Sequence, residues 1–234
     1  MRLDKLFSDA GLLSRRDCAR AVSRGEIVVD GVPASRADMK VDEAKAEIFF
    51  RGERVGFSKF VYVMMNKPEG YVSATTDGRL PVVTELLPEE LKRRGLFPCG
   101  RLDKDTTGFM LLTDDGQTAH RLLSPKHHVE KVYAFTLDAP LPEGAEARFL
   151  AGVRLGDEIC KPAALALDDG RTAGEIVLTE GKYHQIKRMM QREGCTVTSL
   201  ARISFGGIPL DEGLSPGAWR YLTEEETAQL LAQK

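Results

Sequence analysis

The spacing of apolar residues in the first part of the chain predicts two short helices followed by a hairpin. Residues 3–11, "LDKLFSDAG", place apolar side chains on one side of a helix that a glycine ends. Ser14 is expected to cap a second helix, with Asp17 in its first turn. Residues 26–35, "EIVVDGVPAS", predict two strands joined by an Asp-Gly turn.

The remainder of the chain mixes strand and helix patterns in no regular alternation. Strands are predicted at residues 60–66, 109–113, 131–139, 175–179 and 195–203, and helices at 116–123, 183–193 and 222–232. The last helix begins with a Thr-Glu-Glu-Glu capping box. This order favours an α+β fold with a mostly antiparallel, mixed sheet flanked by helices.

The signal weakens between these two regions, over residues 44–58, which are charged and contain one short strand pattern. We interpret this segment as a linker with a connecting strand. The expected organisation is therefore a small domain at 1–43, the linker at 44–58 and a larger domain at 59–234.

The composition is that of an ordinary globular chain, since 42% of the 234 residues are apolar and 29% are charged. Apolar runs such as "FVYVMM" are too short to span a bilayer, and the first residues lack the apolar segment of a signal peptide. We therefore expect a cytoplasmic protein with no membrane partner. The four cysteines contain no CxxC pair, which argues against a zinc site and a disulfide framework.

Basic charge is concentrated in residues 1–24, although the whole chain carries a net charge of −2. Six basic side chains stand there against three acidic ones, a local excess that suits a phosphate-binding surface. They are Arg2, Lys5, Arg15, Arg16, Arg20 and Arg24. Arg16, Arg20 and Arg24 recur four apart and would align on one helix face, which by itself is more typical of a solvated surface.

The order helix, helix, hairpin resembles the S4 RNA-binding domain of ribosomal proteins and RNA-modifying enzymes. The residues that carry the resemblance are "RLDKLF" and "GLLSRRDCARAVSRGEIVVDGVPA". The resemblance implies that Arg15, Arg16, Arg20 and Arg24 face RNA phosphates, so that binding weakens as salt is added. Arg2 and Lys5 are further candidates in the same segment.

Residues 100–116, "GRLDKDTTGFMLLTDDG", place four aspartates around a short apolar run. The opening of this stretch mimics a calcium loop, but its twelfth position is Asp114 rather than glutamate and its flanks are not helical. A polar turn explains Asp114 and Asp115, which are expected to start the following helix. It does not explain why Arg101 and Asp103 directly precede a strand that is apolar enough to be buried.

The same stretch resembles the signature of pseudouridine synthases, in the branch typified by the enzyme of small-subunit ribosomal RNA. Other blocks agree along most of the chain, namely "NKPEGY", "SPKHHVEKVYAFTL", "LTEGKYHQIKRMM", "ARISFGGIPL" and "PGAWRYLTEEE". The resemblance implies a reaction that breaks the bond between ribose C1′ and uracil N1 and rejoins the base through C5. An isomerisation of this kind needs a nucleophile but no redox change or energy input, so no cofactor is expected.

The resemblance assigns the catalytic aspartate to Asp103. Burial under a base would raise the pKa of this carboxyl, and a nearby cation would counteract the rise. The family's basic residue falls on Lys187, with Arg188 as a substitute; since the two project differently from a helix, only one is expected to reach Asp103. Tyr133 matches the family's active-site tyrosine and is expected to pack on the extruded uracil, with a core tyrosine as the alternative.

Candidate RNA contacts near these blocks are Lys67, Arg101, His128 and Arg188. His127 and His128 are adjacent, so in an extended segment they point to opposite sides, and a third ligand at suitable spacing is lacking. No metal is therefore expected, and the histidines are interpreted as RNA contacts or structural residues.

The sequence thus predicts a monomeric isomerase whose partner is ribosomal RNA, as 16S rRNA or as an assembly intermediate of the small subunit. "SPKHHVEK" and a C-terminal segment without a basic tail favour this target over 23S rRNA. Two rivals come from other classes. One is a non-catalytic S4-type RNA-binding or assembly protein, and the other is a metal-dependent hydrolase that uses the aspartates with the two histidines.

Overall fold

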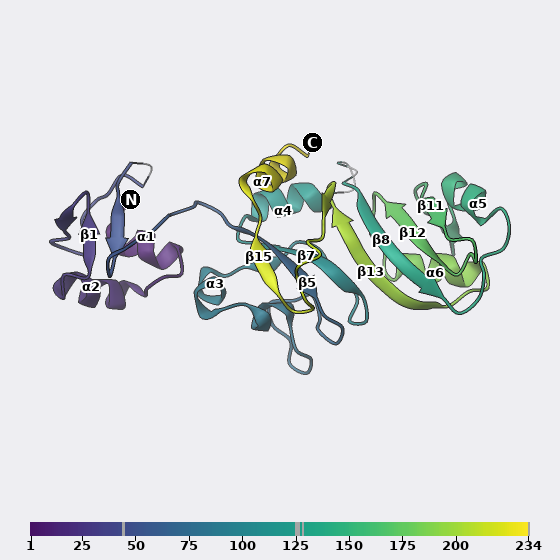
Figure 1. Ribbon diagram of the computed structural model, residues 1–234, viewed down its shortest axis with the longest axis horizontal. Helices are drawn as coiled ribbons and strands as arrows, with labels where there is room; N and C mark the ends of the chain where they lie inside the picture. Colours follow the sequence, from purple (N-terminus) through teal and green to yellow (C-terminus); the bar gives the residue numbers. More distant parts are fainter. Residues whose placement is uncertain (44, 125–126, 128, 234) are drawn as a thin grey trace. The chain divides into compact units, whose positions relative to one another are not determined.

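The computed structural model describes residues 1–43, 45–124, 127 and 129–233. The chain forms two compact units, Met1–Val61 with Leu87–Leu96, and Tyr62–Leu86 with Phe97–Lys234. Both units contain helices and strands (Figure 1), so the predicted α+β class is confirmed. Among the described residues, no helix is both long enough and apolar enough to cross a membrane.

Local signals in the sequence set the elements of the first unit. Its helices are α1 (Leu3–Asp9) and α2 (Arg15–Ser23). The Ser14 hydroxyl accepts the backbone N–H of Asp17 at 3.1 Å, which is the predicted N-cap. Strands β1 (Ile27–Val29) and β2 (Val32–Pro33) flank Asp30 and Gly31, whose φ angles of 50° and 81° allow a tight two-residue turn.

The sheet of this unit has the order β2-β1-β3-β4 and is antiparallel throughout. Strands β3 (Ile48–Phe50) and β4 (Glu53–Arg54) lie within the segment expected to hold one connecting strand. The fully buried ring of Phe7 packs edge-on against Phe50 and Phe57, at centroid distances of 5.9 and 5.4 Å. Segment 48–57 thus contributes to the core of the first unit. The helix α3 (Glu89–Arg94) also belongs to this unit.

The second unit is built on a mixed sheet, which has nine strands over the described residues. Its order is β11-β12-β8-β13-β7-β5-β15, with β14 paired to β13 and β6 paired to β7. The strands are β5 (Tyr62–Lys67), β6 (Phe97–Pro98), β7 (Thr107–Thr113), β8 (Lys131–Leu137), β11 (Ala164–Leu167), β12 (Ala173–Leu178), β13 (Val197–Phe205), β14 (Ile208–Pro209) and β15 (Trp219–Tyr221). Among the pairings between these described strands, β13 with β7 is parallel and the others are antiparallel, in line with the predicted mostly antiparallel, mixed sheet.

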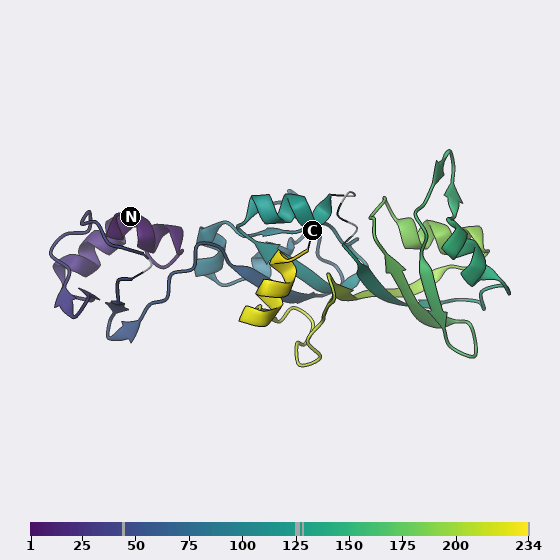
Figure 2. The ribbon, with the colours of Figure 1, turned by 90° about the horizontal axis from the view of Figure 1, so that it is seen from above.

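In the described part of this unit, four helices accompany the sheet, together with the 3₁₀ turn η1 (Val83–Leu86) and a separate hairpin of β9 (Arg154–Leu155) and β10 (Glu158–Ile159). They are α4 (Gly116–Leu123), α5 (Ala145–Ala151), α6 (Gln185–Arg192) and α7 (Glu224–Leu231). Figures 1 and 2 show α6 lying along the part of the sheet that holds β8, β12 and β13. Asp115 caps α4 by accepting the backbone N–H of Thr118 at 3.0 Å, and Thr223 and Glu226 form the predicted capping box of α7.

The strand β7 occupies the centre of the sheet between β13 and β5. Phe109, Met110, Leu111 and Leu112 are each fully buried, so both faces of the strand are covered. This accounts for the unbroken apolar run in the sequence, where a strand with one wet face would alternate. Asp103 and Asp105 therefore directly precede a central strand that is buried on both faces.

Candidate functional site

The site forms around the turn Asp103–Thr106, which leads directly into β7. The backbone N–H of Thr106 donates to the carbonyl of Asp103 at 3.1 Å and closes the turn. On the other side, the Ser73 hydroxyl both donates to the carbonyl of Leu102 and accepts its N–H, each at 2.9 Å. The backbone on either side of Asp103 is therefore fixed, while its carboxylate stays 31% exposed.

The ammonium group of Lys67 binds this turn from the interior of the protein. The side chain of Lys67, the last residue of β5, is fully buried and donates to the carbonyls of Thr106, Pro68 and Lys104 at 2.7, 3.1 and 3.3 Å. Burial lowers the pKa of Lys67 to about 8, against the opposing pull of Asp105 and Asp103. The expectation that Lys67 contacts an RNA phosphate is wrong for this structure, because its three donors are used inside the protein.

The helix α6 brings a second ammonium to the turn. Lys187 Nζ lies 3.1 Å from Asp103 Oδ2 and 2.5 Å from Asp105 Oδ1. Burial pulls the pKa of Lys187 down, but its bonds to Asp105 and Asp103 outweigh this and raise it. The same bond to Lys187 lowers the pKa of Asp105. A protonated lysine thus bridges two carboxylates.

A histidine completes the surroundings of the Asp103 carboxylate. His184 Nε2 lies 3.6 Å from Asp103 Oδ1, the oxygen that Lys187 does not contact. His184 precedes α6 with φ 47° and ψ 36°, a left-handed conformation that is uncommon outside glycine. Neither the position of this histidine nor the pairing of Asp105 was predicted from the sequence. The only available signal was the position of His184 within "YHQIK".

Tyr133 lies on β8 and is 8% exposed. It shares a buried face with Lys131 and Phe135, as the alternation along the strand predicted. The register pairs Tyr133 with Arg202 of β13, and Arg202 with Gly108 of β7. Since neighbouring strands are about 4.8 Å apart, Tyr133 lies about 10 Å from the beginning of β7.

The remaining candidates are distributed over both units. Arg101 is exposed next to the turn, and Arg188 donates to the carbonyl of Tyr183 at 3.4 Å instead of reaching Asp103. His128 lies outside the described residues. In the first unit all six basic candidates are exposed: Arg2, Lys5, Arg15, Arg16, Arg20 and Arg24. Four of them pair with neighbouring acids at 2.8 to 3.7 Å. Asp4, the partner of Arg2, is buried, whereas the exposed pairs of Lys5 and Arg20 open at little cost when a phosphate approaches.

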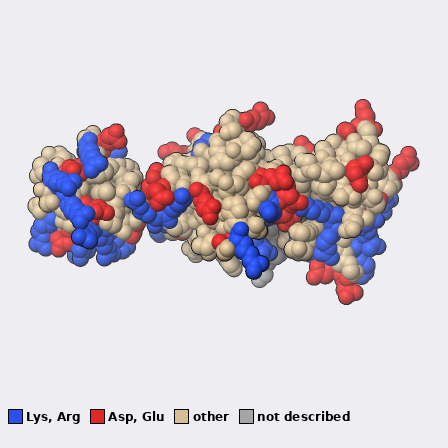
Figure 3. All heavy atoms as spheres, turned by 90° about the horizontal axis from the view of Figure 1, so that it is seen from below, with Lys and Arg blue, Asp and Glu red and all other residues tan. Residues whose placement is uncertain are grey.

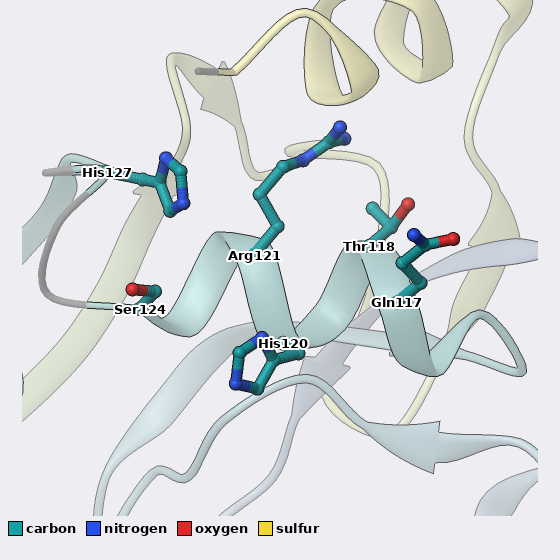
Figure 4. Close-up of a pocket in the computed structure, with 6 residues that line it drawn as sticks. All are labelled: Gln117, Thr118, His120, Arg121, Ser124 and His127. Atoms are coloured by element: carbon teal, nitrogen blue, oxygen red, sulfur yellow. The ribbon is translucent and has the colours of Figure 1, made fainter.

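A cavity of about 740 Å³ lies elsewhere in the second unit (Figure 4). It is lined by Gln117, Thr118, His120, Arg121, Ser124 and His127, and Arg121 points toward α7, where it donates to the carbonyl of Leu231 at 3.1 Å. Neither Asp103 nor Lys187 lines this cavity. Within the described part of the chain, His, Cys, Asp and Glu side chains form no group of three or more that could hold a metal ion.

Two further cations are buried in the sheet beside Tyr133. Arg202 is 2% exposed, donates from Nε to the carbonyl of Phe109 at 2.7 Å and lies over the ring of Phe205. Lys131 is 8% exposed and donates to the carbonyl of Val129 at 2.7 Å. Burial, reinforced by Arg202, lowers the pKa of Lys131 to about 8.

The buried lysine leads to a prediction about stability and pH. The pKa of Lys131 is about 8 in the folded protein and 10.5 in the unfolded chain, so the unfolding free energy rises as the pH rises between these values, and this gain is lost again as the pH falls through 8. Lys131→Met has no group that titrates at this position. As the pH rises from 7.5 to 10.5, the unfolding free energy of this variant should therefore fall by up to about 3 kcal/mol relative to that of the wild type. Urea denaturation across this range measures the difference. The exposed Lys104→Met is the control, and a difference that stays constant with pH would contradict the prediction.

The contacts of α6 predict unequal effects for its two neighbouring cations. Lys187→Met removes the charge that binds Asp103, and we expect kcat of the reaction at this carboxylate to fall by about 100-fold. Arg188→Met leaves that pair intact, and we expect its kcat to stay within about 3-fold of the wild type. Single-turnover assays at saturating enzyme isolate this step from RNA binding. Equal losses in both variants would show that the contact with Asp103 is not what matters.

Comparisons with known proteins identify the family of the chain. A family model described as RNA pseudouridylate synthase matches residues 61–192, and an S4 domain model matches residues 1–48. The chain is 45% identical over 230 residues to an uncharacterized RNA pseudouridine synthase of Bacillus subtilis (strain 168), YtzG, covering 97% of this chain and 96% of that protein. It is 39% identical over 234 residues to ribosomal small subunit pseudouridine synthase A of Escherichia coli (strain K12), covering 99% and 100%.

A solved structure supports the same relationship. The crystal structure of a pseudouridylate synthase matches with a TM-score of 0.70 and 36% sequence identity, covering 98% of this chain and 99% of that one. The family model spans more than half of the chain, and it contains Asp103, Tyr133 and Lys187. The chain therefore belongs to the RNA pseudouridylate synthase family and carries an S4 domain in residues 1–48.

Proposed function

We propose that this protein isomerises one specific uridine of 16S ribosomal RNA to pseudouridine, with Asp103 as the nucleophile. The observation that carries the proposal is the accessible Asp103 carboxylate held 3.1 Å from the Lys187 ammonium on a fixed turn. The small-subunit target is supported by the relative from Escherichia coli and by one from Salmonella typhimurium, 40% identical over 98% of this chain, both named ribosomal small subunit pseudouridine synthase A.

In this reaction every bond change takes place within the uridine and on Asp103. The carboxylate adds to the nucleoside, and the bond between C1′ and N1 breaks. The uracil turns, C5 bonds to C1′, and Asp103 leaves with its electron pair. The proton lost from C5 is balanced by one that N1 gains. The isomer has the composition of the substrate, so the cycle consumes no co-reactant.

The neighbouring residues have distinct tasks in this scheme. Lys187 keeps Asp103 ionised when the base covers it, because desolvation alone would favour the protonated acid. Tyr133 packs against the extruded uracil and assists the removal of the proton from C5. Lys67 holds the carbonyls of the turn from below, so it is a positioning residue.

RNA binding is assigned to the S4 domain and to the cations beside the turn. The exposed arginines of α2 supply charge for phosphates, and Arg101 and Arg188 supply it close to Asp103. Binding of this kind weakens steeply as salt rises, because each phosphate contact releases counterions.

The decisive test is to map pseudouridine in ribosomal RNA from cells that lack this protein and from the same cells carrying the wild-type gene. One 16S position that loses the modification and regains it on complementation supports the proposal. Purified protein should then form pseudouridine in naked 16S rRNA or in a small-subunit assembly intermediate, and comparing these two substrates shows which one it uses.

Other outcomes of this experiment point to the rival functions. Loss at a 23S position would identify a large-subunit enzyme of the same family. If every pseudouridine persists and the purified protein only binds RNA, the chain is a non-catalytic S4-type protein. Activity that disappears with EDTA and returns with a divalent cation would support the hydrolase rival, whereas pseudouridine formation through Asp103 should survive the chelator.

A further inference from the structure

An exposed aromatic pair stands directly beside the Asp103 carboxylate. The rings of Tyr183 and His184 are stacked, with centroids 3.9 Å apart and planes inclined by 16°. Tyr183 is 72% exposed, and His184 Nε2 lies 3.6 Å from Asp103 Oδ1. The pair therefore joins an exposed tyrosine ring to a histidine that lies next to the carboxylate.

The backbone that presents these rings is anchored, although Tyr183 itself is exposed. The buried Gln185 accepts the backbone N–H of Lys182 at 2.9 Å and donates to the Glu180 carboxylate at 2.7 Å. Arg188 donates to the carbonyl of Tyr183 at 3.4 Å. Rings on an anchored loop lose little freedom when a planar ligand stacks on them, which favours binding.

The charge around the pair suits a polyanion. Figure 3 shows Lys and Arg side chains gathered over the part of the second unit that carries α6. Arg188 and Arg192 come from this one helix, and Lys182, which pairs with Glu158 at 2.8 Å, directly precedes Tyr183. An aromatic face among cations is the arrangement that binds single-stranded nucleic acid through its bases and phosphates.

We propose that Tyr183 and His184 form a stacking platform for the nucleobase next to the target uridine. The inference rests on the proposed function, since it places the target uridine at Asp103. His184 is the ring of the pair with a contact to Asp103, so we assign the outer face of Tyr183 to a neighbouring base and not to the reacting one. The spacing of 3.9 Å is close to the rise of about 3.4 Å between stacked bases, so the two protein rings continue a base stack.

The platform offsets the loss of base stacking that occurs when the target uridine is extruded. Extruding a uridine breaks its stacking with both neighbours and leaves one base without a partner. A base that stacks on Tyr183 regains part of that loss and holds the strand while the uridine enters the site. The platform therefore acts on substrate binding and should leave the chemical step unchanged.

The test compares Tyr183→Ala with Tyr183→Phe and with Tyr221→Ala, a tyrosine that is 50% exposed on β15. On an RNA in which the wild type forms pseudouridine, we expect Tyr183→Ala to raise KM about 10-fold with kcat within about 2-fold, as loss of one stacked base predicts. Tyr183→Phe keeps the ring, so it and Tyr221→Ala should both match the wild type.

An abasic nucleotide placed on either side of the target uridine identifies the stacked base. At one of the two positions it should raise KM for the wild type by a similar factor, yet add nothing further to Tyr183→Ala, because both changes remove the same contact. The platform is wrong if KM for Tyr183→Ala equals that of the wild type. It is also wrong if the abasic nucleotide raises KM for Tyr183→Ala by the same factor as for the wild type.

Failure of the proposed function would be visible separately, since the wild type would then form no pseudouridine. The platform is still tested in that case by single-stranded RNA labelled with 2-aminopurine, whose fluorescence falls when it stacks on an aromatic ring. Quenching that is lost in Tyr183→Ala and kept in Tyr183→Phe supports the platform. Equal quenching by the wild type and Tyr183→Ala overturns it.

Discussion

Asp103→Asn should abolish pseudouridine formation, lowering kcat by at least about 1000-fold while the protein stays folded and binds RNA. Asparagine has the shape of aspartate, but its neutral amide cannot add to the nucleoside and then leave as a carboxylate does. The fold should tolerate the change because Asp103 is 31% exposed and Lys187 keeps its bond to Asp105. We expect the unfolding free energy to stay within about 1 kcal/mol of the wild type.

Asp105→Asn is the matched control for this variant. Asp105 lies in the same turn and contacts the same lysine, so the control removes an equal charge without removing the nucleophile. We expect its kcat to stay within about 10-fold of the wild type. Pseudouridine is measured in RNA from complemented cells and in single-turnover assays, and Kd is measured by filter binding. If Asp103→Asn restores the modification fully, Asp103 is not the nucleophile.

Gly108→Ala should destabilise the second unit by at least about 4 kcal/mol. Gly108 has φ 94°, and a Cβ placed on it would lie 2.3 Å from the carbonyl oxygen and 2.9 Å from the nitrogen of Arg202. Both atoms belong to the backbone of β13, so neither can rotate out of the way. The collision is relieved only if β7 and β13 move apart at Gly108, where the two strands pair. Gly108 lies five residues after Asp103 along the chain.

A second glycine in the same unit distinguishes the cost of the left-handed backbone conformation from the cost of the Cβ collision. Gly217 has φ 86°, and a Cβ there would meet nothing within 4 Å. Gly217→Ala therefore reports the left-handed conformation alone, which costs about 1–2 kcal/mol. Urea unfolding followed by the fluorescence of Trp219 gives both values, and kcat of the surviving folded protein should fall in Gly108→Ala only. Equal losses of stability in the two variants would mean that the approach of β13 to β7 is not tight.

Elements with local signals were predictable from the sequence. Ser14 caps α2, Asp115 caps α4 and Thr223 starts α7, because each cap depends on residues three positions apart. The turn at Asp30 and Gly31 follows from two residues that accept a positive φ. By contrast, α3 and α5 were not predicted, and neither has a side chain that caps its first turn. The family was also recognisable, because its motifs are short continuous blocks.

What the sequence by itself determined is the class of fold and the family, and from the family's signature we predict that Asp103 is the nucleophile. The tertiary structure decided which groups surround that aspartate. Lys187 meets Asp103 across 84 positions of sequence, and His184 and Asp105 join them. Lys67, which the sequence suggested as an RNA contact, is buried under the turn instead. The reason is physical: spacing along a chain fixes which residues share a face, but strand order and helix packing fix which faces meet.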